Sequence, residues 1–234
     1  MTRVGLLECD HVDEGLRSID GDYRDMFTHL MAPHRLELVP VDARNGELPE
    51  TASDFDAYLI TGSRASVYDD EPWIDDLSAF VRDVADAGAP LVGICFGHQL
   101  LAHALGGEVR KAETGWGVGP HEVTIEAPEP WMEPGPLRPR LQYMHQDQVV
   151  RLPEGGQVIG ASDHCPVAML RVGDRLLGIQ AHPEFSTAFV EALLDARVDR
   201  IEADRVAAAR RDLGTPTDAD ALAVASWMAA WLRR

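Results

Sequence analysis

The stretch Ala89-Pro90-Leu91-Val92-Gly93-Ile94-Cys95-Phe96-Gly97-His98-Gln99-Leu100-Leu101 decides the fold, because it joins a strand pattern directly to a helix pattern. From Pro90 to Ile94 the sequence is apolar and partly β-branched, and the run has the length of a buried strand. Beyond Gly97 the apolar residues recur at helical spacing, at positions 100, 101, 104 and 105. Cys95 is therefore predicted to lie at a strand-to-helix turn.

Two glycines bracket this cysteine in the pattern Gly93-Ile94-Cys95-Phe96-Gly97. The pattern is typical of a nucleophile elbow, in which residues without side chains allow a strained turn to present the nucleophile. The free N–H groups and the positive dipole end of the following helix favour the thiolate form of such a cysteine. The alternative is a buried structural cysteine beside glycines that a tight turn requires. The motif by itself leaves both interpretations open.

Strand and helix patterns alternate in the chain before this turn. Apolar strands are predicted at 3–8, 36–41 and 57–61, and amphipathic helices at 21–32 and 72–88. Such an alternation predicts short right-handed crossovers and a parallel sheet that is covered on both faces. The predicted fold class is therefore α/β, with a mostly parallel, doubly wound, flavodoxin-like sheet and a nucleophile elbow.

The pattern changes after Leu105, where Gly106-Gly107 ends the helix. Short strand-like segments follow at 108–111, 122–125, 142–143, 157–161, 167–171 and 176–180. They predict a small antiparallel excursion, with a hairpin turn at 172–175 and an exposed proline- and glycine-rich connection at 128–139.

The C-terminal part is predicted to be helical. A long amphipathic segment at about 187–213 is followed by the break Gly214-Thr215-Pro216 and by a last helix from Thr217. Trp227 and Trp231 lie four residues apart on that helix, so they either cap the sheet or meet another subunit. No internal repeat interrupts the chain, and residues 1–234 are expected to form a single domain with C-terminal helices at about 187–234.

Composition excludes several classes of partner. The 234 residues carry a formal net charge of -18, which argues against binding to nucleic acid or to an anionic membrane surface. No apolar run approaches the length needed to cross a bilayer, and the acidic N-terminal stretch does not resemble a signal peptide, so a cytoplasmic location is expected. Cys9, Cys95 and Cys165 are too few for a disulfide framework and lack the paired spacing of a zinc site. We expect neither a metal nor a cofactor.

A second motif supplies groups that a thiol nucleophile needs. The predicted strand 176–180 ends in Ala181-His182-Pro183-Glu184-Phe185. Because His182 and Glu184 are two residues apart, they project to the same side of an extended segment. Glu184 could then bind one ring nitrogen of His182 while the other faces Cys95, which is the arrangement of a base and its orienting group. The alternative for a lone histidine is a solvated or structurally satisfied residue.

Gly-Ile-Cys-Phe-Gly-His-Gln followed by His-Pro-Glu, in this order and on these elements, resembles the class I glutamine amidotransferase domain. The resemblance extends from about Arg3 to Phe185. PfpI-type peptidases, which also have a cysteine elbow, usually place a histidine directly after the cysteine, where this chain has Phe96. The resemblance implies that Cys95 is the nucleophile, that His182 is the general base and acid, and that Glu184 orients His182.

The resemblance also implies an oxyanion hole and a substrate pocket. The backbone N–H of Gly62, after the third strand, would join that of Phe96 in holding an oxyanion. Gln99, one helical turn beyond the nucleophile, would help to bind glutamine.

The segment His145-Gln146-Asp147 would hold the α-amino and carboxylate groups of the substrate, although many members have glycine where this chain has Gln146. Ser63 and Arg64, in the turn after Gly62, depart from the proline- and glycine-rich turn of fused members. Arg64 either is a surface charge or meets a substrate carboxylate.

The function implied is hydrolysis of a γ-glutamyl amide, from glutamine to glutamate and ammonia, through a γ-glutamyl thioester on Cys95. The chain has no Gly-x-x-x-x-Gly-Lys-Ser/Thr phosphate loop, so use of the ammonia would require a separate synthase subunit. One alternative is a standalone γ-glutamyl peptidase that acts on γ-glutamyl peptides or amines. An alternative of another class is a non-catalytic binding or regulatory subunit of a synthase.

Overall fold

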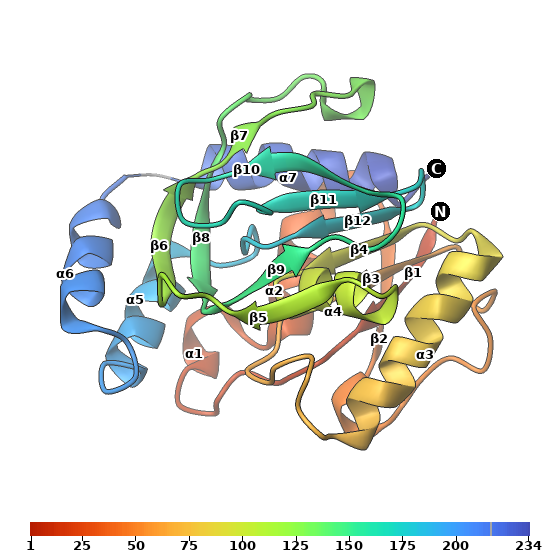
Figure 1. Cartoon of the computed structure of the whole chain (residues 1–234), viewed down its shortest axis with the longest axis horizontal. Helices are drawn as coiled ribbons and strands as arrows, with labels where there is room; N and C mark the ends of the chain where they lie inside the picture. Colours follow the sequence, from red (N-terminus) through yellow and green to blue (C-terminus); the bar gives the residue numbers. More distant parts are fainter. Residues whose placement is uncertain (216) are drawn as a thin grey trace.

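The central β-sheet has the strand order β2-β1-β3-β4-β12-β11-β10-β7 (Figure 1). The computed structural model describes residues 1–215 and 217–234. The parallel strands are β1 (Arg3–Leu7), β2 (Glu37–Val41), β3 (Ala57–Ile60), β4 (Leu91–Ile94) and β12 (Leu176–Ile179). The sheet continues with antiparallel pairing through β11 (Met169–Val172), β10 (Gly156–Ala161) and β7 (Thr124–Ile125). The predicted α/β fold with a mostly parallel sheet is confirmed.

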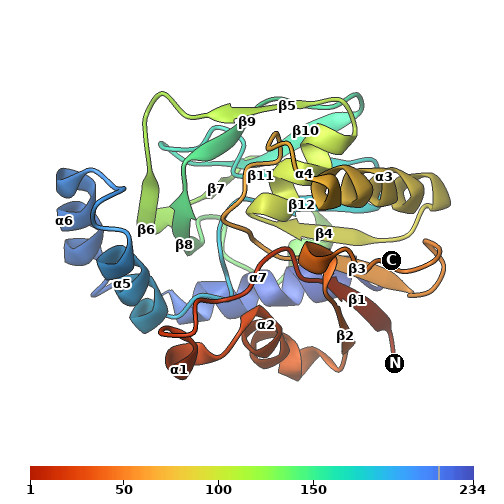
Figure 2. The ribbon, with the colours of Figure 1, turned by 90° about the horizontal axis from the view of Figure 1, so that it is seen from below.

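Helices cover both faces of this sheet, and the alternation of side chains along each strand supplies both faces with apolar groups. Tyr58 and Ile60 of β3 pack with helices α3 (Pro72–Ala87) and α4 (Phe96–Ala104). Leu59, between them, packs on the opposite face with α2 (Tyr23–Met31) and α7 (Asp218–Trp231). Figure 2 shows α2 and α7 on one side of the sheet and α3 and α4 on the other. The sheet is therefore doubly covered, as the alternation of elements predicted.

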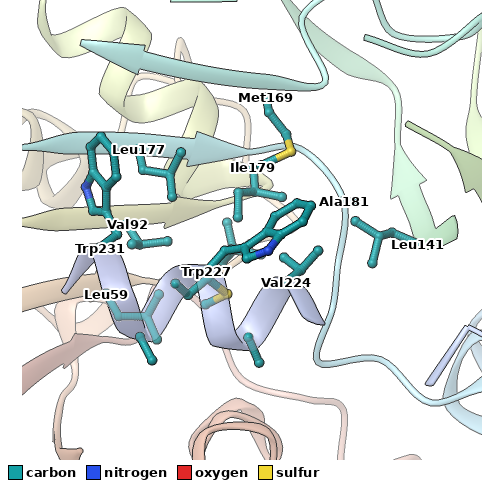
Figure 3. Packing of buried hydrophobic residues seen from close by; sticks show 14 of the residues in the cluster. Leu59, Val92, Leu141, Met169, Leu177, Ile179, Ala181, Val224, Trp227 and Trp231 are labelled. Atoms are coloured by element: carbon teal, nitrogen blue, oxygen red, sulfur yellow. The ribbon is translucent and has the colours of Figure 1, made fainter. Parts of the chain in front are cut away.

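The last helix α7 packs on the sheet with its tryptophans inward. Trp227 and Trp231 are buried beside Leu177 and Ile179 of β12 (Figure 3). The indole N–H of Trp231 donates to the carbonyl of Arg175 at 2.9 Å, which satisfies its polar atom in the core. Of the two roles considered for these tryptophans, capping the sheet is the one observed. Pro216 in the predicted break before this helix lies outside the described residues.

The excursion after α4 forms two small antiparallel sheets. One pairs β5 (Glu108–Lys111) with β9 (Asp147–Arg151), and the other pairs β6 (Gly117–Glu122) with β8 (Arg140–His145). The sequence predicted only part of β8 and neither β6 nor β9. The strand β6 was not predicted because it contains glycine and proline, which are unusual inside strands. Gly119 is required there, since its φ is 77° and an added Cβ would lie 2.9 Å from the Cβ of Ala209.

The C-terminal amphipathic segment is divided into two helices, α5 (Thr187–Ala196) and α6 (Ala203–Asp212). Ser186 caps α5, because its Oγ accepts the N–H of Phe189 at 3.1 Å. The polar turn 197–202 interrupts the helical pattern and is anchored in the core by Ile201 alone. This turn brings Arg197 and Arg200 to the cavity described below.

Short helical elements complete the described chain: α1 (Arg17–Asp20), η1 (Ala32–His34), η2 (Ala43–Asn45) and η3 (Pro130–Met132). The last of these lies in the connection 128–139, which is largely exposed as predicted. Among the described residues, no helix combines the length and the apolar character needed to cross a bilayer.

Candidate active site

Cys95 lies on a strained turn between β4 and α4. Its φ of 50° and ψ of -99° are unusual for a residue with a side chain, and such strain persists only where the surroundings enforce it. A Cβ on Gly93 would lie 2.3 Å from the carbonyl oxygen of Gly97, and one on Gly97 would lie 2.7 Å from that of Ile60. Both positions therefore require glycine, which is the steric reason for the elbow pattern.

His182 reaches Cys95 because β12 lies beside β4 in the sheet. Ile179 pairs with Ile94, and the N–H of Cys95 donates to the carbonyl of Ile179 at 2.8 Å. The chain continues for three residues beyond this bond to His182, whose N–H donates to the carbonyl of Gln142 at 2.8 Å. Two motifs that are far apart in the sequence thus meet at the carboxyl ends of two neighbouring parallel strands.

The ring of His182 is fixed on two sides. Its Nδ1 lies 2.7 Å from Oε1 of Glu184, and its plane stacks on Phe185 with centroids 3.9 Å apart and an interplanar angle of 4°. Because a carboxylate only accepts hydrogen bonds, Nδ1 carries a proton and Nε2 is left for Cys95. The structure brings Cys95, His182 and Glu184 together at one site, and their catalytic roles stay a prediction.

The electrostatics of this site favour a charged imidazole. Burial opposes the charge, but Glu184 and the Cys95 sulfur, through their charges and hydrogen bonds, raise the pKa of His182 to about 10. The Glu184 side chain is fully buried, so its interaction with His182 is little screened by solvent. At neutral pH the imidazole is therefore protonated and can stabilise a neighbouring thiolate.

Two backbone amides lie beside the sulfur. Gly62 follows β3, and a Cβ there would lie 2.9 Å from Cε1 of His182 and 3.7 Å from the Cβ of Cys95, so the backbone passes close to both groups. Phe96 is the first residue of α4, where the N–H has no partner within the helix. The arrangement is suited to holding an oxyanion that forms next to Cys95.

Cys95 opens into a cavity of about 130 Å³. The residues predicted on the substrate side all line it: Ser63, Arg64, Gln99, His145, Gln146 and Asp147. They come from the turn after β3, from α4 and from the junction of β8 and β9, and the tertiary structure brings them together.

Several of these residues already form hydrogen bonds or ion pairs within the protein. The guanidinium of Arg64 binds Asp10, with Nε–Oδ2 at 2.9 Å and Nη2–Oδ1 at 3.0 Å, and it also contacts Asp13. The amide of Gln99 donates to the carbonyl of Asp147 at 2.8 Å. These side chains therefore brace the cavity walls. Arg64 is an exposed charge, as one of the two expectations had it, and it is paired with Asp10 at the cavity, while a contact with a substrate carboxylate stays a prediction.

Gln180 was not predicted from the sequence, and it connects Cys95 to this wall. Its fully buried side chain accepts an N–H of Gln99 at 3.1 Å and directs its own Nε2 at the Cys95 Sγ at 3.6 Å. A polar residue at the end of an apolar strand, two positions before His182, was the available signal. It projects to the same side as His182 on an extended chain.

Basic residues at the cavity were missed as well. Lys111 is the last residue of β5, and Arg197 and Arg200 lie in the turn between α5 and α6. Nothing in their local sequence distinguishes them from surface charges, because only the packing of the excursion against α5 and α6 brings them beside Cys95.

Comparison with known proteins identifies the class to which this fold and site belong. The family Glutamine amidotransferase class-I matches residues 24–194. The chain belongs to the class I glutamine amidotransferase family, as the sequence resemblance indicated.

The relatives include both peptidases and synthases. Gamma-glutamyl peptidase 2 of Arabidopsis thaliana is 28% identical over 207 residues, which cover 86% of this chain and 82% of the relative. GMP synthase [glutamine-hydrolyzing] of Clostridium acetobutylicum is 33% identical over 178 residues, covering 74% of this chain and only 33% of the synthase. A crystal structure of a glutamine amidotransferase from Thermotoga maritima has a TM-score of 0.78 at 19% identity, covering 97% of this chain and 98% of that one, and shows a shared fold.

Proposed function

We propose that this protein hydrolyses γ-glutamyl amides through a γ-glutamyl thioester on Cys95. The observation that carries the proposal is the position of His182, which is held at 2.7 Å by the buried carboxylate of Glu184 and whose charge is stabilised by the Cys95 sulfur. The names of the relatives support the reaction class, because both γ-glutamyl peptidases and glutamine-hydrolysing synthases act on a γ-glutamyl bond.

In the first half of the reaction, the Cys95 thiolate attacks the carbonyl carbon of the γ-amide and a C–S bond forms. The N–H groups of Gly62 and Phe96 hold the negative charge that develops on the carbonyl oxygen. His182 gives its proton to the amide nitrogen, the C–N bond breaks, and the amine leaves. The product at this point is a γ-glutamyl thioester and a neutral His182.

In the second half, water attacks the thioester carbon while His182 takes a proton from it. The C–S bond breaks, glutamate leaves, and the thiolate and the protonated imidazole are restored. Glu184 stabilises the charged imidazole in both halves and keeps Nε2 directed at the sulfur. If the leaving amine is ammonia, a synthase subunit is the partner that would use it.

The test is a Cys95→Ala variant assayed with glutamine and with γ-glutamylglycine. We expect hydrolysis of every γ-glutamyl amide that the wild type accepts to fall by at least about 10³-fold, because the covalent route is lost. An acid-quenched wild-type reaction should contain protein whose mass is increased by one glutamyl group, located on Cys95.

The matched control is Cys165→Ala, which removes another buried thiol that does not line the cavity. It should retain activity and form the adduct. Circular dichroism and a melting curve verify that both variants are folded. Turnover by Cys95→Ala at the wild-type rate would overturn the mechanism, and a wild-type protein without turnover or adduct on any γ-glutamyl amide would favour a binding subunit.

A further inference from the structure

The cavity beside Cys95 has a positively charged rim that no partner neutralises. Lys111, Arg197 and Arg200 line it, and none of the three forms an ion pair with any residue in the ranges 1–215 and 217–234. Neighbouring arginines behave differently, since Arg64 binds Asp10 and Asp13, and Arg205 binds Glu202. In a chain with a formal net charge of -18, unpaired cations in one place need an explanation.

Arg197 is the innermost of the three. Its side chain is partly buried, and burial lowers the pKa of its guanidinium, while the nearby Tyr23 and Cys95 partly restore it. An arginine remains charged at any pH that a folded protein tolerates. A partly buried guanidinium without a partner loses hydration without compensation, so it is suited to an anion that arrives with the substrate.

The balance of charge at the cavity indicates how many anionic groups the substrate carries. Asp147 is the acidic residue of the lining, and its carboxylate accepts hydrogen bonds from Ser66 at 2.5 Å and Tyr68 at 3.0 Å. It can balance one of the three unpaired cations. The rim therefore keeps a net positive charge, which favours a substrate with a net negative charge.

Glutamine does not meet this requirement, because its ammonium and its carboxylate cancel. A γ-glutamyl amino acid does, since the amine that leaves brings a second carboxylate. That carboxylate lies two bonds from the scissile nitrogen, so it is close to Cys95 when the amide is attacked. Arg197 and Cys95 line the same cavity.

We propose that Arg197, flanked by Lys111 and Arg200, binds a carboxylate on the leaving amine, so that the substrates are γ-glutamyl amino acids and peptides with a free carboxylate. The inference rests on the proposed hydrolysis of γ-glutamyl amides and specifies its substrate class. Arg197 forms a charge-assisted contact with the leaving group, and Lys111 and Arg200 add to the positive potential around it. Glutamine and γ-glutamyl alkylamines lack this contact.

The test compares γ-glutamylglycine with γ-glutamylglycinamide, which differ only in the charge of the leaving group, and adds glutamine. Wild-type protein should have a kcat/KM for γ-glutamylglycine at least about 10-fold above that for the other two, as one charge-assisted contact predicts. The KM for γ-glutamylglycine should rise with salt, because the rim is open to solvent.

The decisive variant is Arg197→Gln, which removes the charge and retains hydrogen-bonding capacity. Its kcat/KM for γ-glutamylglycine should fall about 10- to 100-fold, chiefly through KM, while the values for γ-glutamylglycinamide and glutamine change by less than about 3-fold. Arg211→Gln is the matched control, because Arg211 is an exposed residue of α6 that does not line the cavity. It should leave all three substrates unaffected.

Two results would overturn the inference and leave the proposed function standing. One is equal use of the three substrates by wild-type protein, and the other is an equal loss on all three in Arg197→Gln, which would show that Arg197 binds the glutamyl part or supports the fold. Lys111→Gln is a second probe, with an expected loss of about 2- to 5-fold on γ-glutamylglycine alone. Absence of hydrolysis of every γ-glutamyl amide by wild type would instead overturn the proposed function itself.

Discussion

The elbow around Cys95 and the rim of the cavity next to it are built in opposite ways. The elbow is determined by close backbone contacts: Gly93 is required by its contact with Gly97, four residues later, and Gly97 by its contact with Ile60 at the end of the nearby strand β3. The rim is assembled from β5 and from the turn between α5 and α6, whose residues are far apart in the sequence. Backbone shape thus decides where Cys95 lies, whereas residues from distant parts of the chain supply the charge around the cavity beside it.

The difference predicts different consequences of substitution. A change at the elbow or at its histidine partner should affect every substrate, because in the proposed mechanism all substrates share the attack by Cys95. A change at the rim should affect substrates selectively. The following variants test the elbow side of this comparison, and Arg197→Gln tests the other.

Among variants that keep Cys95, Glu184→Gln should have the largest effect on catalysis. The amide has nearly the same shape, but it removes the charge that raises the pKa of His182. We expect kcat/KM to fall about 10²- to 10⁴-fold on all γ-glutamyl substrates, because the imidazole loses both its orientation and its charge stabilisation. Steady-state kinetics with γ-glutamylglycine and γ-glutamylglycinamide measures the loss, and a selective loss on one of them would contradict it.

The same variant has a pH signature. A base whose pKa is raised in the folded protein keeps its proton at neutral pH and loses it as the pH rises through about 10. The alkaline limb of the wild-type kcat/KM profile should therefore lie well above the ordinary range of histidine. In Glu184→Gln this limb should move to lower pH, and an unchanged limb would show that Glu184 does not control the charge of His182.

Gly93→Ala should have the largest effect on stability. The added Cβ would lie 2.3 Å from the carbonyl oxygen of Gly97, and a backbone atom in a core turn cannot move aside without shifting α4. We expect the free energy of unfolding in urea to fall by about 3 kcal/mol or the protein to remain unfolded. Gly15→Ala is the control, since no atom lies within 4 Å of its added Cβ, and it should change stability little. Equal stability of both variants would refute the steric account of the elbow.

Gln180→Leu should have a smaller effect. The substitution keeps the volume and removes the N–H that points at the Cys95 Sγ and the oxygen that accepts from Gln99. We expect kcat to fall about 10-fold on all substrates with little change in KM, because Gln180 positions the thiolate and does not contact the substrate. The rate of alkylation of Cys95 by iodoacetamide as a function of pH supplies a second readout. An unchanged alkylation profile would indicate that Gln180 has only a packing role.

The sequence by itself determined the order of the elements and the centre of the site. Apolar runs such as Leu91–Ile94 and the helical spacing after Gly97 fix strands and helices through local periodicity, so the parallel part of the sheet could be predicted. Glycine at 93 and 97 marked the elbow, and the two-residue spacing of His182 and Glu184 marked the pair that meets it.

The tertiary structure alone decided the rest. The strands β6 and β9 were not predicted. Glycine and proline weaken the strand pattern of β6, and both strands are stabilised by pairing with strands in another part of the chain. The same holds for Gln180, whose role depends on its contacts with Gln99 and Cys95, and for Arg197, which resembles any surface arginine in the sequence. Periodicity and the spacing of motifs are properties of neighbouring residues and can be read from the sequence. The charge of a cavity is a sum over residues that only folding brings together.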